Sequence, residues 1–170
     1  MTETLQEYEQ RPPARPTFLT VLCILTFIGS GWGIVSGIIT YATAASKAKE
    51  MVVTQQKSAE DLKKNDQKGE GSGIAQKMVS SMSVFTEGNL KKAGIAGMVS
   101  ALLCLAGAFM MWKLNKNGYY IYILGTLAGI ASPFMIYGSD NIISIMSSIM
   151  VGFVGIVFVI LYGVNLKYMK

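Results

Sequence analysis

The chain has 170 residues, of which 51 % are hydrophobic and only 15 % are charged, and its net charge is +5. This composition is typical of an integral membrane protein and leaves no room for a separate soluble domain. Histidine is absent, which excludes His-based general-base catalysis, His-ligated haem and the common zinc sites.

The N-terminal segment, residues 1–17, is a polar lead-in that ends in a proline-rich stretch. Prolines disfavour a helix interior, so we expect extended backbone there. The rest of the chain, residues 18–170, is predicted to form a single four-span membrane domain.

Four apolar stretches contain no charged residue, and each is long enough to cross a bilayer, which takes roughly 20 apolar residues. The first is too long for the core of a cleaved signal peptide, which spans roughly 7–15 residues. The connections between the last three are short and force those spans into an antiparallel arrangement. The sequence therefore predicts an all-α, four-transmembrane-helix bundle, with these spans: Phe18–Ala45, Ala93–Trp112, Tyr119–Gly138 and Ile142–Leu166.

Residues 46–92, between the first two spans, are predicted to form an extramembrane helical hairpin. Helix-forming residues are followed by a glycine-rich turn at residues 65–73 and by a second amphipathic helix, which Glu87-Gly88-Asn89 interrupts. Three interpretations stay open: the hairpin covers the bundle end, docks a partner subunit, or lies on the membrane surface. The apolar positions of the expected docking face are Met51, Val52, Leu62, Ile74, Met78, Met82 and Phe85.

The short connections carry recognisable turn residues. Asn117-Gly118 predicts a tight turn before the third span. Gly138 suits a helix C-terminus, and Asp140 or Asn141 suits the next N-cap. Aromatic residues around the second turn predict a belt at one membrane interface: Trp112, Tyr119, Tyr120 and Tyr122.

Small residues recur at four-residue spacing in every span, which lets helix backbones approach closely in lipid. Gly29, Gly33 and Gly37 form such a stripe in the first span, and Gly125 and Gly129 lie in the third. These residues are predicted to pack the bundle or to meet a partner helix. The first stripe is our choice for a partner, because its three glycines leave the most complete groove.

The spans offer little chemistry. Ion transporters normally place ionisable side chains at bilayer depth, and none occurs here. Cys23 and Cys104 lie inside spans and are interpreted as small packing residues. Neither a catalytic set nor metal-ligand spacing is present, so we expect no enzyme activity, no cofactor and no metal. Polar side chains within the spans are mainly hydroxyls, among them Thr26, Ser30, Ser36, Thr126 and Ser132.

The basic residues concern orientation rather than nucleic acid, for which we expect no role. The hairpin has more lysines in total, but they are diluted through a long segment with several carboxylates. The terminal side has its basic residues on short segments at span ends, where they influence orientation most. This distribution predicts cytoplasmic termini and an extracytoplasmic hairpin.

The segment Met111-Trp112-Lys113-Leu114 through Gly118-Tyr119-Tyr120-Ile121-Tyr122 resembles the second turn of small, uncharacterised four-span bacterial membrane proteins. The match covers about a dozen residues. It implies an envelope location, namely the bacterial inner membrane, and no particular chemistry.

These features predict a non-catalytic integral membrane protein, acting as a structural or accessory subunit of a membrane complex. Its partners would be the lipid bilayer and other membrane subunits or a second copy of itself. The alternative is a channel or carrier for a small apolar or lipid substrate. Such a protein requires either a cavity between the spans or a homo-oligomer that encloses one. A third hypothesis is a membrane sensor that uses the hairpin to bind a ligand.

Overall fold

The computed structural model describes residues 16–65 and 72–169, so most of the polar lead-in and part of the hairpin turn lie outside the described residues. Within these ranges, four helices are long and apolar enough to cross a membrane: α2 (Thr17–Ala42), α5 (Glu87–Trp112), α6 (Asn117–Tyr137) and α7 (Ile142–Asn165). The hairpin consists of α3 (Ala44–Asn65) and α4 (Ser72–Ser81), and short 3-10 helices follow α4 and α7 at Met82–Val84 and Leu166–Tyr168. The predicted all-α four-span bundle is confirmed, and the chain is an integral membrane protein.

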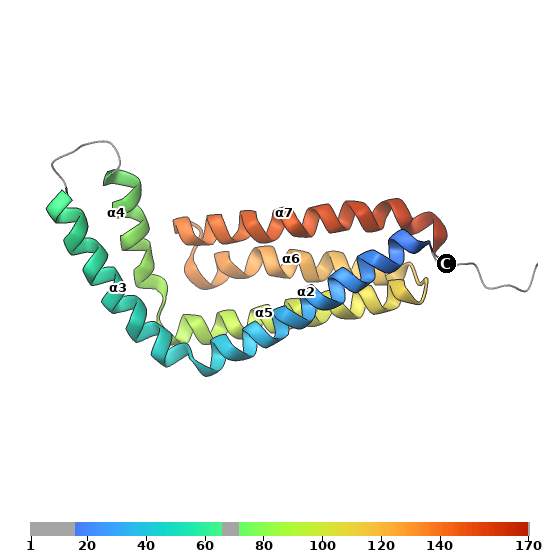
Figure 1. Cartoon of the computed structure of the whole chain (residues 1–170), viewed down its shortest axis with the longest axis horizontal. Coiled ribbons are helices and arrows are strands. Elements are labelled where there is room, and N and C mark those ends of the chain that lie inside the picture. Colours follow the sequence, from blue (N-terminus) through green and yellow to red (C-terminus); the bar gives the residue numbers. More distant parts are fainter. Residues whose placement is uncertain (1–15, 66–71, 170) are drawn as a thin grey trace, which may run out of the picture.

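The four membrane helices lie side by side, and the first of them also touches the last (Figure 1). Helix α5 packs along α2 on one side and along α6 on the other, and α6 packs along α7. Helix α2 runs obliquely, from the end of α7 toward the start of α5 (Figure 1). The α2–α7 contact is therefore confined to one end of the bundle, and the two helices diverge toward the hairpin.

A buried cluster closes the bundle at the end where α2 begins and α7 ends. Tyr162 and Met111 are completely buried there, and Met169, from the segment after α7, is buried in the same cluster. In lipid such clusters are held by van der Waals packing rather than by exclusion of water. The cluster comprises Leu19, Leu22, Cys23, Met111, Tyr122, Tyr162 and Met169.

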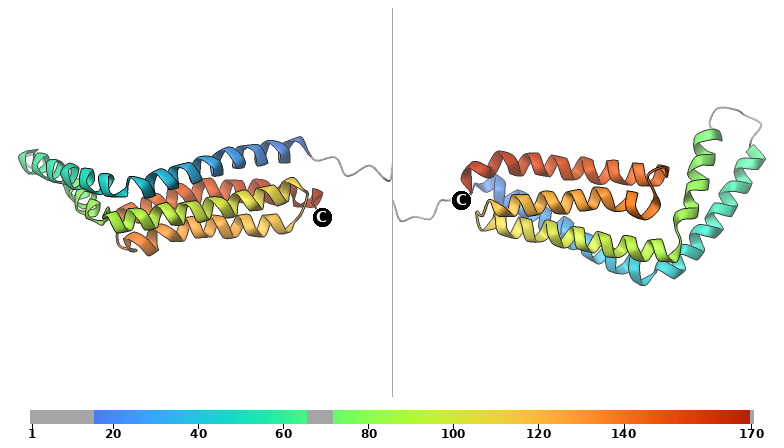
Figure 2. Two further views of the ribbon diagram at one scale, coloured as in Figure 1. Left: turned by 90° about the horizontal axis from the view of Figure 1, so that it is seen from below. Right: turned by 180° about the vertical axis from the view of Figure 1, so that it is seen from behind.

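The hairpin leaves the bundle at a steep angle, and α4 leads back to the start of α5, beside the turn between α6 and α7 (Figures 1 and 2). Only Thr43 separates α2 from α3. Its amide donates to Ile39 O at 2.9 Å, its hydroxyl donates to the same carbonyl at 2.7 Å, and Lys47 N donates to Thr43 O at 2.9 Å. Hydrogen bonding thus continues through the bend, and a threonine hydroxyl on the preceding turn is a known cause of such bends.

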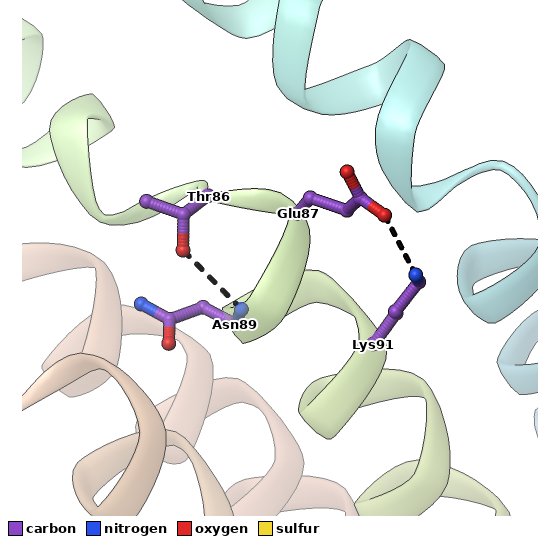
Figure 3. Close-up of polar contacts among 4 residues, drawn as sticks. All are labelled: Thr86, Glu87, Asn89 and Lys91. Carbon is purple, nitrogen blue, oxygen red and sulfur yellow. Dashed lines mark hydrogen bonds and ion pairs between the residues drawn. The ribbon is translucent and has the colours of Figure 1, made fainter.

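Helix α5 begins earlier than predicted. Glu87-Gly88-Asn89 does not interrupt the hairpin but forms the first turn of α5, so the predicted start at Ala93 is wrong. Thr86 is the N-cap, its hydroxyl accepting from Asn89 N at 3.3 Å, and Glu87 pairs with Lys91 at 2.6 Å (Figure 3). A capping hydroxyl and an acidic first residue suit a helix N-terminus, which explains the earlier start.

The second turn also differs from the prediction. Asn117-Gly118 is not the turn but the first two residues of α6, and the chain reverses at residues 113–116, where Leu114 has φ 63°. A Cβ on Gly118 would lie 2.5 Å from Gly107 O, so this glycine serves close packing of α5 against α6. At the third turn the predictions hold: Gly138 ends α6 with φ 88°, and the Asn141 side chain accepts from Ile143 N.

Candidate functional site

A cavity of about 650 Å³ lies between the membrane helices on the hairpin side of the buried cluster. All four spans contribute to its walls. Its volume falls within the range of about 300–1,000 Å³ that small-molecule sites occupy. The lining residues used below are Thr26, Gly29, Ser30, Gly33, Gly97, Ser100, Cys104, Tyr122, Thr126, Gly129, Ser132, Pro133, Val154 and Phe158.

The cavity exists because α2 and α7 diverge. Three pairs of neighbouring helices pack along their lengths, but α2 meets α7 only beside the buried cluster. A Cβ added to Gly29 or to Gly97 would meet nothing within 4 Å, so both walls are open at these points. On the opposite side Val154 and Phe158 of α7 form the wall. The seam between α2 and α7 therefore gives the cavity a lateral opening at bilayer depth.

The closed end of the cavity is polar. The hydroxyl groups of Thr26 and Tyr162 are 2.8 Å apart and share a hydrogen bond that joins α2 to α7. The ring of Tyr122 meets the ring of Tyr162 edge-on, with 5.1 Å between centroids. Tyr122 is only 6 % exposed, so the prediction that it belongs to an interfacial belt is wrong. Tyr122 lies on the face of α6 that packs against α7, where its ring contacts that of Tyr162.

Three further hydroxyl groups along the walls are bonded to helix backbones. Ser100 donates to Gly125 O at 2.7 Å, which ties α5 to α6, and Thr126 donates to Tyr122 O at 3.0 Å within α6. Ser132 donates to Gly129 O at 3.1 Å. That last carbonyl would otherwise lack its usual helical donor, because Pro133 has no N–H. These groups therefore stabilise the walls.

The hydroxyl of Ser30, unlike these three, is not bonded to a helix backbone that the structure describes. Ser30 lines the cavity and is only 8 % exposed, yet its hydroxyl makes no hydrogen bond with any residue that the structure describes. No fully enclosed side-chain oxygen in the described chain lacks a partner, so this hydroxyl keeps some accessible surface. A buried residue with an accessible, unbonded hydroxyl presents that group to the cavity.

The glycines singled out from sequence are placed mostly inside the bundle. A Cβ on Gly37 would lie 2.9 Å from Gly94 O, and one on Gly125 would lie 2.9 Å from Cys104 N. A Cβ on Gly33 would lie 3.2 Å from Ala101 Cβ, and one on Gly129 would lie 2.9 Å from Ser100 Oγ. Three of the five also line the cavity: Gly29, Gly33 and Gly129.

The apolar positions of the hairpin turn partly toward each other. Leu62, Met78 and Met82 line a hollow of about 330 Å³ between α3 and α4. The ring of Phe85 meets that of Tyr137 at the end of α6, with centroids 5.6 Å apart. Of the remaining predicted positions, Met51 is half-buried, Val52 is 51 % exposed, and Ile74 lies within α4.

Sequence reasoning missed the contribution of three residues to this site: Cys104, Tyr122 and Tyr162. Cys104 lines the cavity instead of merely packing, whereas Cys23 is completely buried and donates to Ala108 O. The available signal was the position of Tyr162 within the last span, because a buried tyrosine hydroxyl normally has a partner.

The lining sets the chemistry that the cavity can support. It contains no charged side chain, and the described part of the chain holds no group of three residues able to bind a metal ion. Apolar walls with a few hydroxyl groups suit the binding of a neutral, mostly apolar molecule. In comparisons with known proteins, no family model, curated protein or solved structure matches this chain.

Proposed function

We propose that this protein is a non-catalytic membrane protein that binds a small apolar or lipid molecule in the cavity between α2 and α7. The observation that carries the proposal is the cavity itself, about 650 Å³ in volume, with apolar walls and a lateral opening. Of the two main functions that the sequence suggested, a carrier or binding protein requires such a cavity, whereas a bundle that serves only packing does not.

The position of the opening supports a ligand that arrives from the bilayer. A molecule dissolved in the hydrocarbon can pass between α2 and α7 without crossing a polar headgroup layer. The closed end, where Tyr162 bonds Thr26, blocks passage toward the terminal side of the bundle. The shape therefore favours binding or carriage over an open channel through one protomer.

The proposal predicts photolabelling of the cavity walls. The protein would be reconstituted in liposomes with a sixteen-carbon hydrocarbon that carries a mid-chain diazirine and a terminal alkyne, and adducts would be mapped by mass spectrometry. We expect adducts on the cavity faces of α2 and α5, and Gly97→Leu should reduce them severalfold. A leucine here has space because nothing lies within 4 Å of the added Cβ, and the side chain would fill the cavity.

A matched control is Val99→Leu, which enlarges a lipid-facing side chain on the same helix. Adducts spread evenly over lipid-facing residues, with no difference between the Gly97→Leu and Val99→Leu proteins, would contradict the proposal.

A second candidate is the accessory-subunit function. It is favoured by the hairpin, where Val52 and Val53 are 51 % and 49 % exposed on a helix outside the spans, because apolar surface in water often marks a protein contact. Affinity purification in several mild detergents, followed by sizing and mass spectrometry, tests it. A stoichiometric complex with another membrane protein is expected, and a bare monomer in every detergent would oppose this function.

A bacterial inner membrane with cytoplasmic termini is the location that we propose for the protein. The basic residues at the ends of the spans and the short resemblance around Trp112 support it.

A further inference from the structure

We infer that the ligand of the cavity carries one neutral hydrogen-bonding group, a carbonyl or a hydroxyl, within an otherwise apolar body, and that this group pairs with Ser30. The inference rests on the proposed function, because it names the class of molecule that the same cavity would bind.

The first argument is the state of the Ser30 hydroxyl. Serines in membrane helices commonly bond their own backbone, as Ser132 does here. Ser30 instead is 92 % buried, given its 8 % exposure, and has no hydrogen-bond partner among the described residues. A polar group in apolar surroundings gains stability when a partner arrives. A ligand with a suitable group would supply that partner.

The second argument is charge. No charged side chain lines the cavity, so nothing there could neutralise a carboxylate or a phosphate. Placing an isolated charge in such surroundings is strongly unfavourable. The group that meets Ser30 must therefore be neutral.

The third argument is depth. Ser30 lies 13 residues after Thr17 in the 26-residue helix α2, near its midpoint. That position corresponds to the centre of a hydrocarbon layer about 30 Å thick. The ester groups of an ordinary phospholipid lie at the edges of this layer, so its chains present only hydrocarbon at Ser30. The inferred ligand is instead a neutral lipid-soluble molecule whose polar group can reach the bilayer centre.

The test uses two photoprobes on the full-length protein in liposomes. One is the sixteen-carbon hydrocarbon diazirine described above, and the other is identical except for a ketone a few carbons away from the diazirine, so that both probes label through the same dialkyl carbene. We expect the ketone probe to label the cavity face of α2 about threefold to tenfold more than the hydrocarbon, the gain of one hydrogen bond. Ser30→Ala should abolish this excess, so that the two probes label the cavity face of α2 equally.

The matched control is Ser36→Ala, which removes an exposed hydroxyl from the same helix and should preserve the excess. Ser30→Ala breaks no hydrogen bond of the described structure, and continued hydrocarbon labelling will report that its cavity is intact.

The outcomes separate the two proposals. Equal labelling by both probes, or an excess that survives Ser30→Ala, would overturn the inference about ligand class while the cavity remains a binding site. Absence of cavity labelling by either probe would overturn the proposed function and this inference with it.

Discussion

At the scale of single residues, the hydrogen bond between Tyr162 and Thr26 joins the first and the last membrane helix. Both side chains are buried, and the two residues are 136 positions apart in sequence. In the hydrocarbon layer water is not available as a substitute partner, so this bond is not readily replaced when one hydroxyl is removed. This bond also joins α2 to α7 at the closed end of the cavity.

Removing this bond should destabilise the bundle modestly. Tyr162→Phe keeps the ring and its packing on Tyr122. It should lower the free energy of unfolding by roughly 0.6 kcal/mol and at most about 1.7 kcal/mol, the average and the maximum measured for hydrogen bonds between membrane helices. Unfolding in mixed micelles would measure it.

Thr26→Val should lower the free energy of unfolding by a similar amount. The double variant should lose little more stability than either single variant, because both changes remove the same bond. Tyr168→Phe, at a tyrosine that is 46 % exposed, is the control and should change little. Strictly additive effects of Tyr162→Phe and Thr26→Val would argue against a shared bond.

At the scale of helices, glycines set how closely the spans approach. At Gly107 and Gly118 the backbones of α5 and α6 come so close that a Cβ on either residue would lie within 3 Å of the other helix. The same holds for Gly37 and Gly94 between α2 and α5. These contacts fix the two tight interfaces that flank α5.

The packing of α5 against α6 should therefore be sensitive to one methyl group. We expect Gly118→Ala to lower the free energy of unfolding by about 1–3 kcal/mol, because the added atom would lie 2.5 Å from Gly107 O and 2.7 Å from Met111 N.

Gly31→Ala is the matched control for this glycine. A Cβ there meets nothing within 4 Å, and alanine favours a helix interior by about 1 kcal/mol over glycine. The free energy of unfolding of the Gly31→Ala protein should stay the same or rise. Equal effects of the two variants in thermal unfolding would show that close approach at Gly118 does not matter.

The four membrane helices were predictable because the length of an uninterrupted apolar run in the sequence shows whether it can cross a bilayer. The residues typical of turns were a weaker guide to where the helices begin and end. Asn117-Gly118 matches a tight turn, but the same glycine is needed for packing against Gly107, and sequence cannot distinguish the two uses. The chain then reverses at Leu114, which has a positive φ that its residue type does not suggest.

The cavity could not be predicted, because it depends on the angle between helices. The Gly37–Gly94 contact brings α2 onto α5 near the hairpin, and the Thr26–Tyr162 bond holds α2 against α7 at the other end. Each contact involves residues far apart in sequence. Only their combination opens the seam, which then places Ser30 beside a void.

At the scale of the whole molecule, orientation remains a prediction. Cysteines introduced at Gln56 in α3 and at Asn117 in the second turn region occupy opposite ends of the bundle, and both positions are exposed. With cytoplasmic termini, a membrane-impermeant maleimide should label Gln56→Cys in spheroplasts, and Asn117→Cys only after lysis.

The parent chain measures any background from Cys23 and Cys104, which lie within the spans. The reverse pattern of labelling would place the hairpin in the cytoplasm and contradict the proposed orientation.

The bend at Thr43 has a mechanical consequence. Backbone hydrogen bonds run from Ile39 through Thr43 to Lys47, so α2 and α3 form one bent rod with no flexible loop between them. Torque applied to the outer arm is transmitted to α2, whose inner half is a wall of the cavity. The Gly37–Gly94 crossing lies just inside the bend and can act as the fulcrum. Anything that fixes the position of α3 outside the membrane would therefore also fix the direction of α2 inside it.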